Sequence, residues 1–126
     1  MIISPVKEPI TEILSEQPTN VLYEEARQYA RLFKALSDPN RLCILHLLLR
    51  DGPLMVLRIK ERLREEYSIS IQQPTVSHHL KALEGAGLIK GIRSGQRRCY
   101  YCTRPQLIEW FLADIEHADR EAPDAE

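Results

Sequence analysis

Apolar side chains recur every three to four positions along most of this chain, which is the period of one face of an α-helix. This spacing predicts a first helix over 21–36, and Asp38 and Pro39 then supply a side-chain cap and a fixed first φ angle for a second. The predicted helices cover residues 21–36, 39–50, 54–65, 73–83 and 105–118. Because the second helix is apolar around most of its circumference, we expect it to form the centre of the core.

The period falls towards two between the last two predicted helices. Residues 88–92 and 97–102 are rich in β-forming side chains and flank Ser94 and Gly95, so they predict a β-hairpin. The predicted order is α-α-α-α-β-β-α, a mostly α fold with one small hairpin. This order is typical of a winged helix-turn-helix, in which the helix before the hairpin enters the major groove of DNA.

Length and the two ends of the chain set the expected domain organisation. The chain has 126 residues, which is about one domain. Residues 1–20 contain three prolines and predict a flexible arm, residues 21–118 predict the folded domain, and residues 119–126 predict an acidic tail. The first residues lack the pattern of a secretion signal, and no segment has the ~20 apolar residues of a membrane span, so we expect a cytoplasmic protein without a membrane partner.

Charge is unevenly distributed along the sequence. The formal net charge is −1, which by itself does not favour a nucleic-acid partner. Residues 88–104, however, hold five basic side chains and no acid, whereas residues 109–126 hold seven acids and one arginine. The hairpin therefore predicts a positive patch.

The predicted helix 73–83 carries polar side chains that suit base recognition, and the hairpin carries cations that can reach phosphates. The predicted DNA-binding residues are Gln73, Thr75, Ser77, His78, His79 and Lys81 on the helix and Arg93, Gln96, Arg97 and Arg98 on the hairpin. A polar helix face is often only a solvated face. A polar helix directly before an acid-free basic hairpin is a much rarer combination, so double-stranded DNA is the predicted partner.

Two other classes of function fit the sequence less well. An enzyme would need a nucleophile with a partnered base, or a Gly-rich phosphate loop, and neither stands at a recognisable spacing. A winged-helix protein-interaction module without inducer sensing is the alternative interpretation. We would expect such a module to lose the hairpin cations, which are present.

Three segments of the chain are LSDPNRL at 36–42, QPTVSHHLKAL at 73–83 and AGLI at 86–89. Together they resemble the arsenical-resistance-repressor (ArsR/SmtB-type) family of winged-helix transcriptional regulators. The resemblance implies a homodimeric repressor that binds an inverted-repeat operator and is released by an inducer. It also implies DNA contacts in the groove and a wing around Gly95, the contacting residues being Gln73, Thr75, Ser77 and His78.

The helices at 21–36 and 105–118 are the predicted dimer interface. The resemblance implies this arrangement, and both helices carry more apolar surface than a compact core around the second helix would absorb. A protein with one reading helix per subunit also needs a second, about one helical turn of DNA away, to gain adequate specificity.

The usual metal sites of this family are missing from the sequence. Metal-sensing members carry a Cys-x-Cys pair at positions that are Met55 and Leu57 here. The positions that match a second family site are Arg104, Gln106, Glu116 and Arg120. Because arginine cannot ligate a cation, we expect no metal at the usual family positions.

Three cysteines remain as candidates for inducer sensing. Cys43, Cys99 and Cys102 are an odd number without a secretion signal, which favours reduced thiols. Cys99 and Cys102 are three residues apart in a predicted strand, so they point to opposite faces unless the strand bends. Two interpretations stay open: purely structural cysteines, or a thiol sensor that includes Cys43 and binds trivalent arsenic or another soft ion, or forms a disulfide. No other cofactor is indicated.

The stretch 64–72 before the reading helix is longer than the tight turn usual at this point in the family. It predicts either an extension of the preceding helix or an outward loop. The first DNA contact is therefore expected at Gln72 or Gln73.

Overall fold

The computed structural model describes the backbone of residues 18–121 and the side chains of residues 21–114. Most of the predicted N-terminal arm, residues 1–17, and the last residues of the predicted acidic tail, 122–126, lie outside the described residues. The chain divides after Phe33 into two compact units, which are described separately.

Helix α2 (Pro18–Leu36) begins before the predicted start at residue 21 and continues into the second unit, where Ala35 and Leu36 are buried. Large apolar side chains are more than half exposed along the part that belongs to the first unit. They are Val21, Leu22, Tyr23, Tyr29 and Phe33. This is the apolar surface that the sequence predicted for the first helix.

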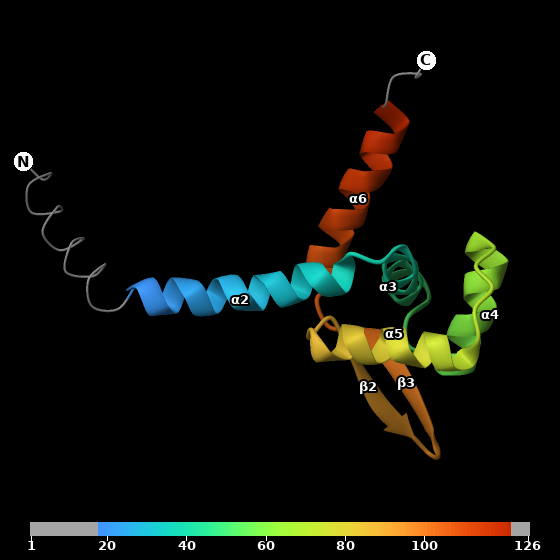
Figure 1. Ribbon diagram of the computed structural model, residues 1–126. Helices are drawn as coiled ribbons and strands as arrows, with labels where there is room; N and C mark the ends of the chain where they lie inside the picture. Colours follow the sequence, from blue (N-terminus) through green and yellow to red (C-terminus); the bar gives the residue numbers. More distant parts are fainter. Residues whose placement is uncertain (1–17, 122–126) are drawn as a thin grey trace, which may run out of the picture. The chain divides into compact units, whose positions relative to one another are not determined.

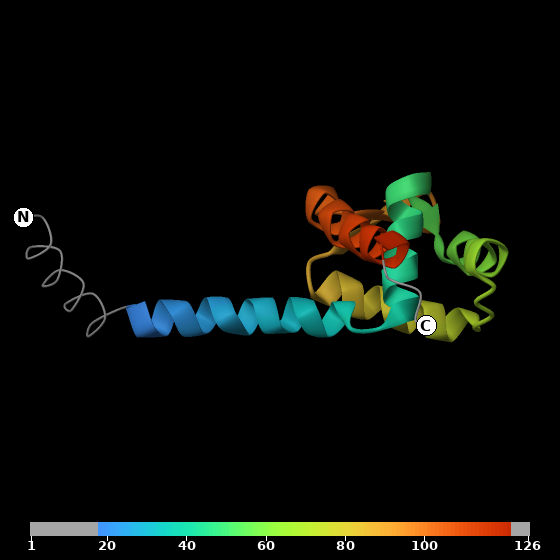
Figure 2. The ribbon, with the colours of Figure 1, turned by 90° about the horizontal axis from the view of Figure 1, so that it is seen from above.

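Helix α3 (Pro39–Asp51) forms the centre of the second unit, as its apolar sequence predicted. Asp38 caps it, because the Oδ1 atom accepts hydrogen bonds from the backbone N–H groups of Asn40 at 2.8 Å and Arg41 at 3.2 Å. Its inner side chains are almost inaccessible to solvent, with Ile44, Leu45 and Leu47 at 0% exposure. Viewed from above, α3 lies between α6 and α4 (Figure 2).

The helix-turn-helix consists of α4 (Val56–Tyr67) and α5 (Gln73–Gly85). The long turn extends α4 to Tyr67 and then continues as an irregular segment over 68–72. Arg62 joins α4 to the end of α3, because its guanidinium contacts Asp51 at 2.9 Å, and it also contacts Glu66 within α4 at 3.2 Å. His46 of α3 also hydrogen-bonds Tyr67, the last residue of α4.

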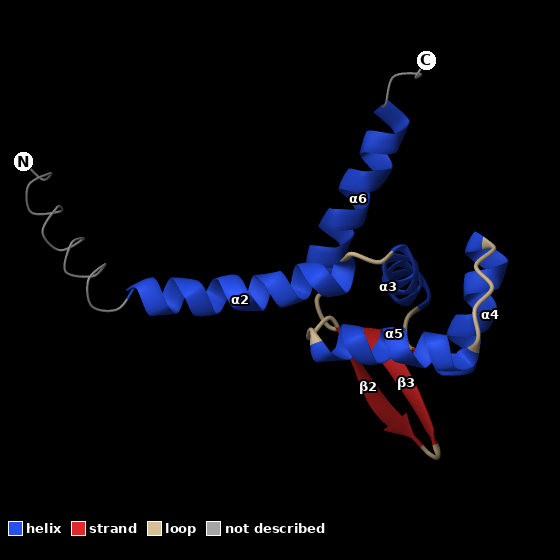
Figure 3. Cartoon of the chain, viewed as in Figure 1, coloured by secondary structure: helices blue, strands red, loops and turns tan. Residues whose placement is uncertain are grey.

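A three-stranded antiparallel sheet has the order β1-β3-β2 and consists of β1 (Leu54–Met55), β2 (Ile89–Ser94) and β3 (Arg97–Cys102). The predicted helix start at residue 54 is wrong, because Leu54 and Met55 pair with Tyr100 and Cys99 of β3 before α4 begins. Strands β2 and β3 form the predicted hairpin, which projects beyond α5 (Figure 3).

Helix α6 (Pro105–Glu121) follows the hairpin and contacts α3. Ile108 is 1% exposed on its inner side, whereas Trp110 is 67% exposed. The helix passes the predicted end at residue 118. In the described part of the chain, no helix has the length and apolar character needed to cross a membrane. The predicted winged helix-turn-helix is confirmed, with β1 as an additional short strand (Figure 1).

Candidate nucleic-acid interface

Helix α5 separates its apolar and polar side chains onto two faces, as the 3.6-residue period requires. Val76, Leu80 and Leu83 are at most 1% exposed and pack into the core. The exposed side chains are those of Gln73, Thr75, Ser77, His78 and Lys81. Five of the six predicted DNA-binding positions on this helix therefore lie at the surface. Gln72 precedes the helix in extended conformation, so α5 itself begins at Gln73.

His79 is the exception, because the structure does not place it on the exposed polar face where the sequence predicted it. The side chain is only 7% exposed, because His79 comes three residues after Val76 and four before Leu83 on the core face. Its Nδ1 atom accepts a hydrogen bond from Nε of Arg41 at 3.1 Å. The ring proton must then sit on Nε2. His79 therefore joins α5 to the start of α3 through a buried hydrogen bond.

Acidification is expected to destabilise the fold through His79. Burial, the largest cause, lowers the pKa of His79 below its ordinary value of about 6.5, while Asp38 raises it and Arg41 lowers it. The unfolded chain therefore binds the proton more readily, and the free energy of unfolding falls as the pH drops through about 6.5 towards the folded-state pKa.

Urea unfolding at about pH 7.5 and about pH 5.5 measures this effect in the wild type and in His79→Gln. Glutamine keeps an oxygen acceptor for Arg41 but does not titrate. The wild type should lose more stability on acidification than the variant, and equal losses in the two proteins would contradict the prediction.

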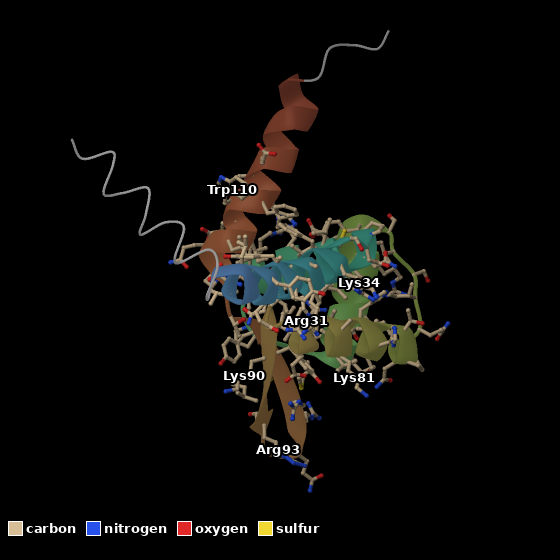
Figure 4. The ribbon with its side chains drawn as sticks, turned by 60° about the vertical axis from the view of Figure 1, so that its left-hand side comes forward. Arg31, Lys34, Lys81, Lys90, Arg93 and Trp110 are labelled. Atoms are coloured by element: carbon tan, nitrogen blue, oxygen red, sulfur yellow. The ribbon has the colours of Figure 1, made fainter. Side chains whose placement is uncertain are left out.

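The wing presents most of its polar side chains to solvent. Its turn lies at Gly95, whose φ of 68° suits a residue without a Cβ atom. The exposed wing residues are Lys90, Arg93, Gln96, Arg97 and Arg98. Figure 4 shows Lys81 of α5 on the same side of the second unit as Lys90 and Arg93 of the wing, whereas Trp110 of α6 lies on the opposite side. The reading helix and the wing together therefore form one polar, basic surface.

Among the side chains that the structure describes, Arg98 differs from the other wing cations in having an acidic partner. Its Nη2 atom lies 3.2 Å from Oε2 of Glu84, near the end of α5. The same carboxylate oxygen accepts a hydrogen bond from the backbone N–H of Gly91 at 3.2 Å. The sequence pattern did not predict the contribution of Glu84, although an acid close before an acid-free basic hairpin is a visible signal.

The cysteines lie on different parts of the second unit. Ile92 and Ile89 of β2 pair with Cys99 and Cys102, which are three residues apart in a regular strand and so point to opposite faces of the sheet. Cys43 lies on α3, and all three thiols are unpaired. Burial raises the pKa of the Cys43 and Cys102 thiols, which disfavours the thiolate form.

The search for metal ligands covers only the residues that the structure describes. Among them, no group of three or more histidine, cysteine, aspartate or glutamate side chains is arranged to hold an ion. Glu116 and Arg120, at two of the family positions considered above, have side chains outside the described residues.

Comparison with known sequences places these features in a family. The helix-turn-helix domain family matches residues 36–92. An uncharacterized HTH-type transcriptional regulator of Methanocaldococcus jannaschii is 42% identical, with 69% of this chain and 88% of that protein aligned. The regulator NmtR of Mycobacterium tuberculosis is 37% identical over 75% of each chain. The arsenic resistance transcriptional regulator ArsR1 of Pseudomonas putida is 31% identical, over 75% of this chain and 72% of that protein.

Solved structures agree with this placement. A homodimeric winged helix-turn-helix DNA-binding domain of Mycobacterium bovis, from a possible ArsR-family regulator, aligns with a TM-score of 0.63 and 26% identity over 88% of this chain and 92% of that one. The transcriptional repressor PagR of Bacillus anthracis aligns with a TM-score of 0.60 and 27% identity over 72% and 97%. These relatives identify a DNA-binding transcriptional regulator and not an enzyme. The chain therefore belongs to the ArsR/SmtB family of winged helix-turn-helix transcriptional regulators.

Proposed function

We propose that this protein is a sequence-specific repressor that binds an inverted-repeat operator as a homodimer and is released by an inducer. The exposed face of α5 reads base edges in the major groove, and the wing binds the phosphate backbone. Gln73 suits adenine, and Thr75 and Ser77 suit either kind of base or a phosphate.

One observation carries this proposal: Lys81, Lys90 and Arg93 lie on one side of the second unit (Figure 4). None of the three forms an ion pair with any residue that the structure describes. Cations without a partner are available to replace the counterions of a phosphate backbone, which supplies much of the affinity for DNA. The overall charge of −1 does not oppose this function, because the acids are concentrated elsewhere.

Helices α2 and α6 are the proposed dimer interface. Large apolar side chains stand exposed on both, with Leu22 at 68% and Trp110 at 67%. Exposed side chains of this size on two helices are typical of a surface that a second subunit covers. A two-fold pair of α5 helices would then match the symmetry of an inverted repeat.

The identity of the inducer stays a prediction, with trivalent arsenic, another soft ion or an oxidant acting on Cys99 or Cys102 as the candidates. One relative is named an arsenic resistance regulator, which favours testing arsenite first. The opposite orientation of the two thiols means that direct pairing requires the strand to bend. The test replaces Cys99 and Cys102 by serine and measures DNA affinity before and after arsenite or mild peroxide is added. If the variant is released from DNA as readily as the wild type, these thiols are not the sensor.

The salt dependence of DNA binding tests the proposed function. The wild-type protein should protect an inverted repeat in DNA flanking its own coding region, and its affinity for that duplex should fall steeply with salt. Replacing Arg93 and Arg97 together by alanine should reduce the slope of log affinity against log salt by about 4, because the homodimer loses two cations from each subunit and each phosphate-binding side chain accounts for about 1.

Arg64→Ala is the matched control, since it removes a positive charge near the end of α4. Its slope should stay at the wild-type value. A wild-type protein that binds no duplex, or binds with little salt dependence, would instead favour the protein-interaction module.

A further inference from the structure

The wing is joined to the reading helix by a small set of contacts around Glu84. Its Oε2 atom accepts hydrogen bonds from the backbone N–H of Gly91 and from Nη2 of Arg98, both at 3.2 Å. The Arg98 guanidinium also lies over the ring of Tyr100, 5.8 Å from the ring centroid, within the range of a cation–π contact. One carboxylate at the end of α5 therefore holds both strands of the hairpin.

Gly91 leaves room for this arrangement. A Cβ atom at this position would lie 2.4 Å from Nε of Arg98 and 2.9 Å from a ring carbon of Tyr100. Both distances are shorter than a non-bonded contact allows. The missing side chain on β2 therefore lets the Arg98 side chain cross the hairpin to reach Glu84.

Glu84 also reduces the repulsion between two arginines that the register of the hairpin places opposite each other. Arg93 and Arg98 are direct partners across β2 and β3, so their side chains share one face of the sheet. Like charges directly opposite each other repel. Because Glu84 compensates the charge of Arg98, Arg93 remains the uncompensated cation of this pair and extends from the outer part of the wing (Figure 4).

The outer part of the hairpin has no third strand beside it, so its orientation depends on contacts closer to α5. Strand β1 pairs only with Tyr100 and Cys99 of β3, so the pairs Arg93–Arg98 and Ser94–Arg97 extend beyond it. At this outer part, the Nη1 atom of Arg97 lies 3.8 Å from the sulfur of Met55, a weak hydrogen-bond acceptor. The contacts of Glu84 are therefore well placed to set the angle between the wing and α5.

We propose that Glu84 and Arg98 fix the wing against the reading helix, and that Arg98 is a positioning residue for DNA binding instead of a phosphate ligand. This inference rests on the proposed DNA-binding function. It assigns different roles to two arginines that face each other in the same hairpin, with Arg93 binding phosphate and Arg98 orienting the strand that presents it.

Measuring DNA affinity over a range of salt concentrations separates these roles. The probe is a duplex that the wild-type protein selects from a random-sequence library. Arg93→Ala should lower the salt slope by about 2, as expected when each subunit of the dimer loses one phosphate-binding cation. Arg98→Ala should weaken binding by about three- to tenfold while the slope stays at the wild-type value.

Whether Glu84→Ala tightens or weakens DNA binding distinguishes most clearly between a positioning role and a purely electrostatic one. Removing an acid close to a DNA-binding wing should by itself tighten binding, because it reduces repulsion from phosphates. We expect Glu84→Ala to weaken binding instead, by an amount similar to Arg98→Ala. The double variant should be no weaker than either single variant, because both substitutions break the same ion pair.

Three results would overturn the inference: a flatter salt slope for Arg98→Ala, unchanged or tighter binding for Glu84→Ala, or additive effects in the double variant. A wild-type protein that shows no salt-dependent binding would contradict the proposed function itself. Thermal unfolding checks that each variant is folded. If Glu84→Ala is not, Glu84→Gln carries the test, since it keeps an acceptor for Gly91 but removes the charge that faces Arg98.

Hydrogen exchange supplies a measurement without DNA. The Gly91 amide belongs to the edge strand β2 and is protected by Glu84. Its exchange should accelerate in Glu84→Ala and not in Arg93→Ala. Equal exchange rates in the two variants would show that Glu84 does not hold the wing.

Discussion

Leu80→Ala is expected to lower the free energy of unfolding by about 2–5 kcal/mol, a large share of the ~5–15 kcal/mol that stabilises a typical domain. Leu80 is 1% exposed on the inner face of α5, so the substitution removes buried methyl groups and leaves a cavity under the reading helix. Urea or thermal unfolding measures the effect. DNA binding should fall as well, because the unfolded fraction rises and α5 loses its support.

Lys81→Ala, one residue later, is the matched control with the opposite outcome. Lys81 is exposed on the outer face, so the free energy of unfolding should change by no more than about 0.5 kcal/mol. DNA affinity should nevertheless fall, with a smaller salt slope. If Lys81→Ala unfolds the protein, or Leu80→Ala leaves its stability unchanged, the assignment of the two faces of α5 is wrong.

The period of apolar residues was sufficient to predict the helices and the hairpin. The cap at Asp38 was also predictable, because a short acidic side chain before Pro39 has few other uses. Strand β1 could not be predicted in the same way. It has only two residues, and it is defined by pairing with Tyr100 and Cys99, more than forty positions away in the chain.

His79 shows a different limit of prediction from sequence. Two adjacent histidines were assigned to one polar face, although neighbouring residues on a helix point about 100° apart. The spacing from Val76 to Leu83 contained enough information to place His79 on the core face. What the sequence could not supply was its partner, because Arg41 comes from another helix and the hydrogen bond exists only after α3 and α5 pack.

The role of Arg98 required the register of the hairpin. A run of basic residues predicts a positive patch but does not say which cations already have partners. The structure separates Arg98, paired with Glu84, from Arg93, which has no ion pair among the described side chains. Composition therefore predicted a basic hairpin, but it could not predict which of the hairpin cations has an acidic partner.

The second large effect is expected at the proposed dimer interface. Trp110→Asp places a charge where α6 exposes its largest apolar side chain, and burying that charge against a second subunit would be costly. We expect the dimer to dissociate to monomers, which sedimentation equilibrium would measure. DNA affinity should fall by roughly 100-fold, because a monomer engages only one half-site of an inverted repeat.

Leu57→Asp provides the comparison, since Leu57 is 57% exposed but lies on α4, outside the proposed interface. It introduces the same charge at a similarly exposed apolar position, so it should leave the dimer intact. A dimeric Trp110→Asp together with a monomeric Leu57→Asp would move the interface from α6 to α4. Because two α5 helices must lie about one turn of DNA apart to read both half-sites, that result would also require a different spacing of the operator.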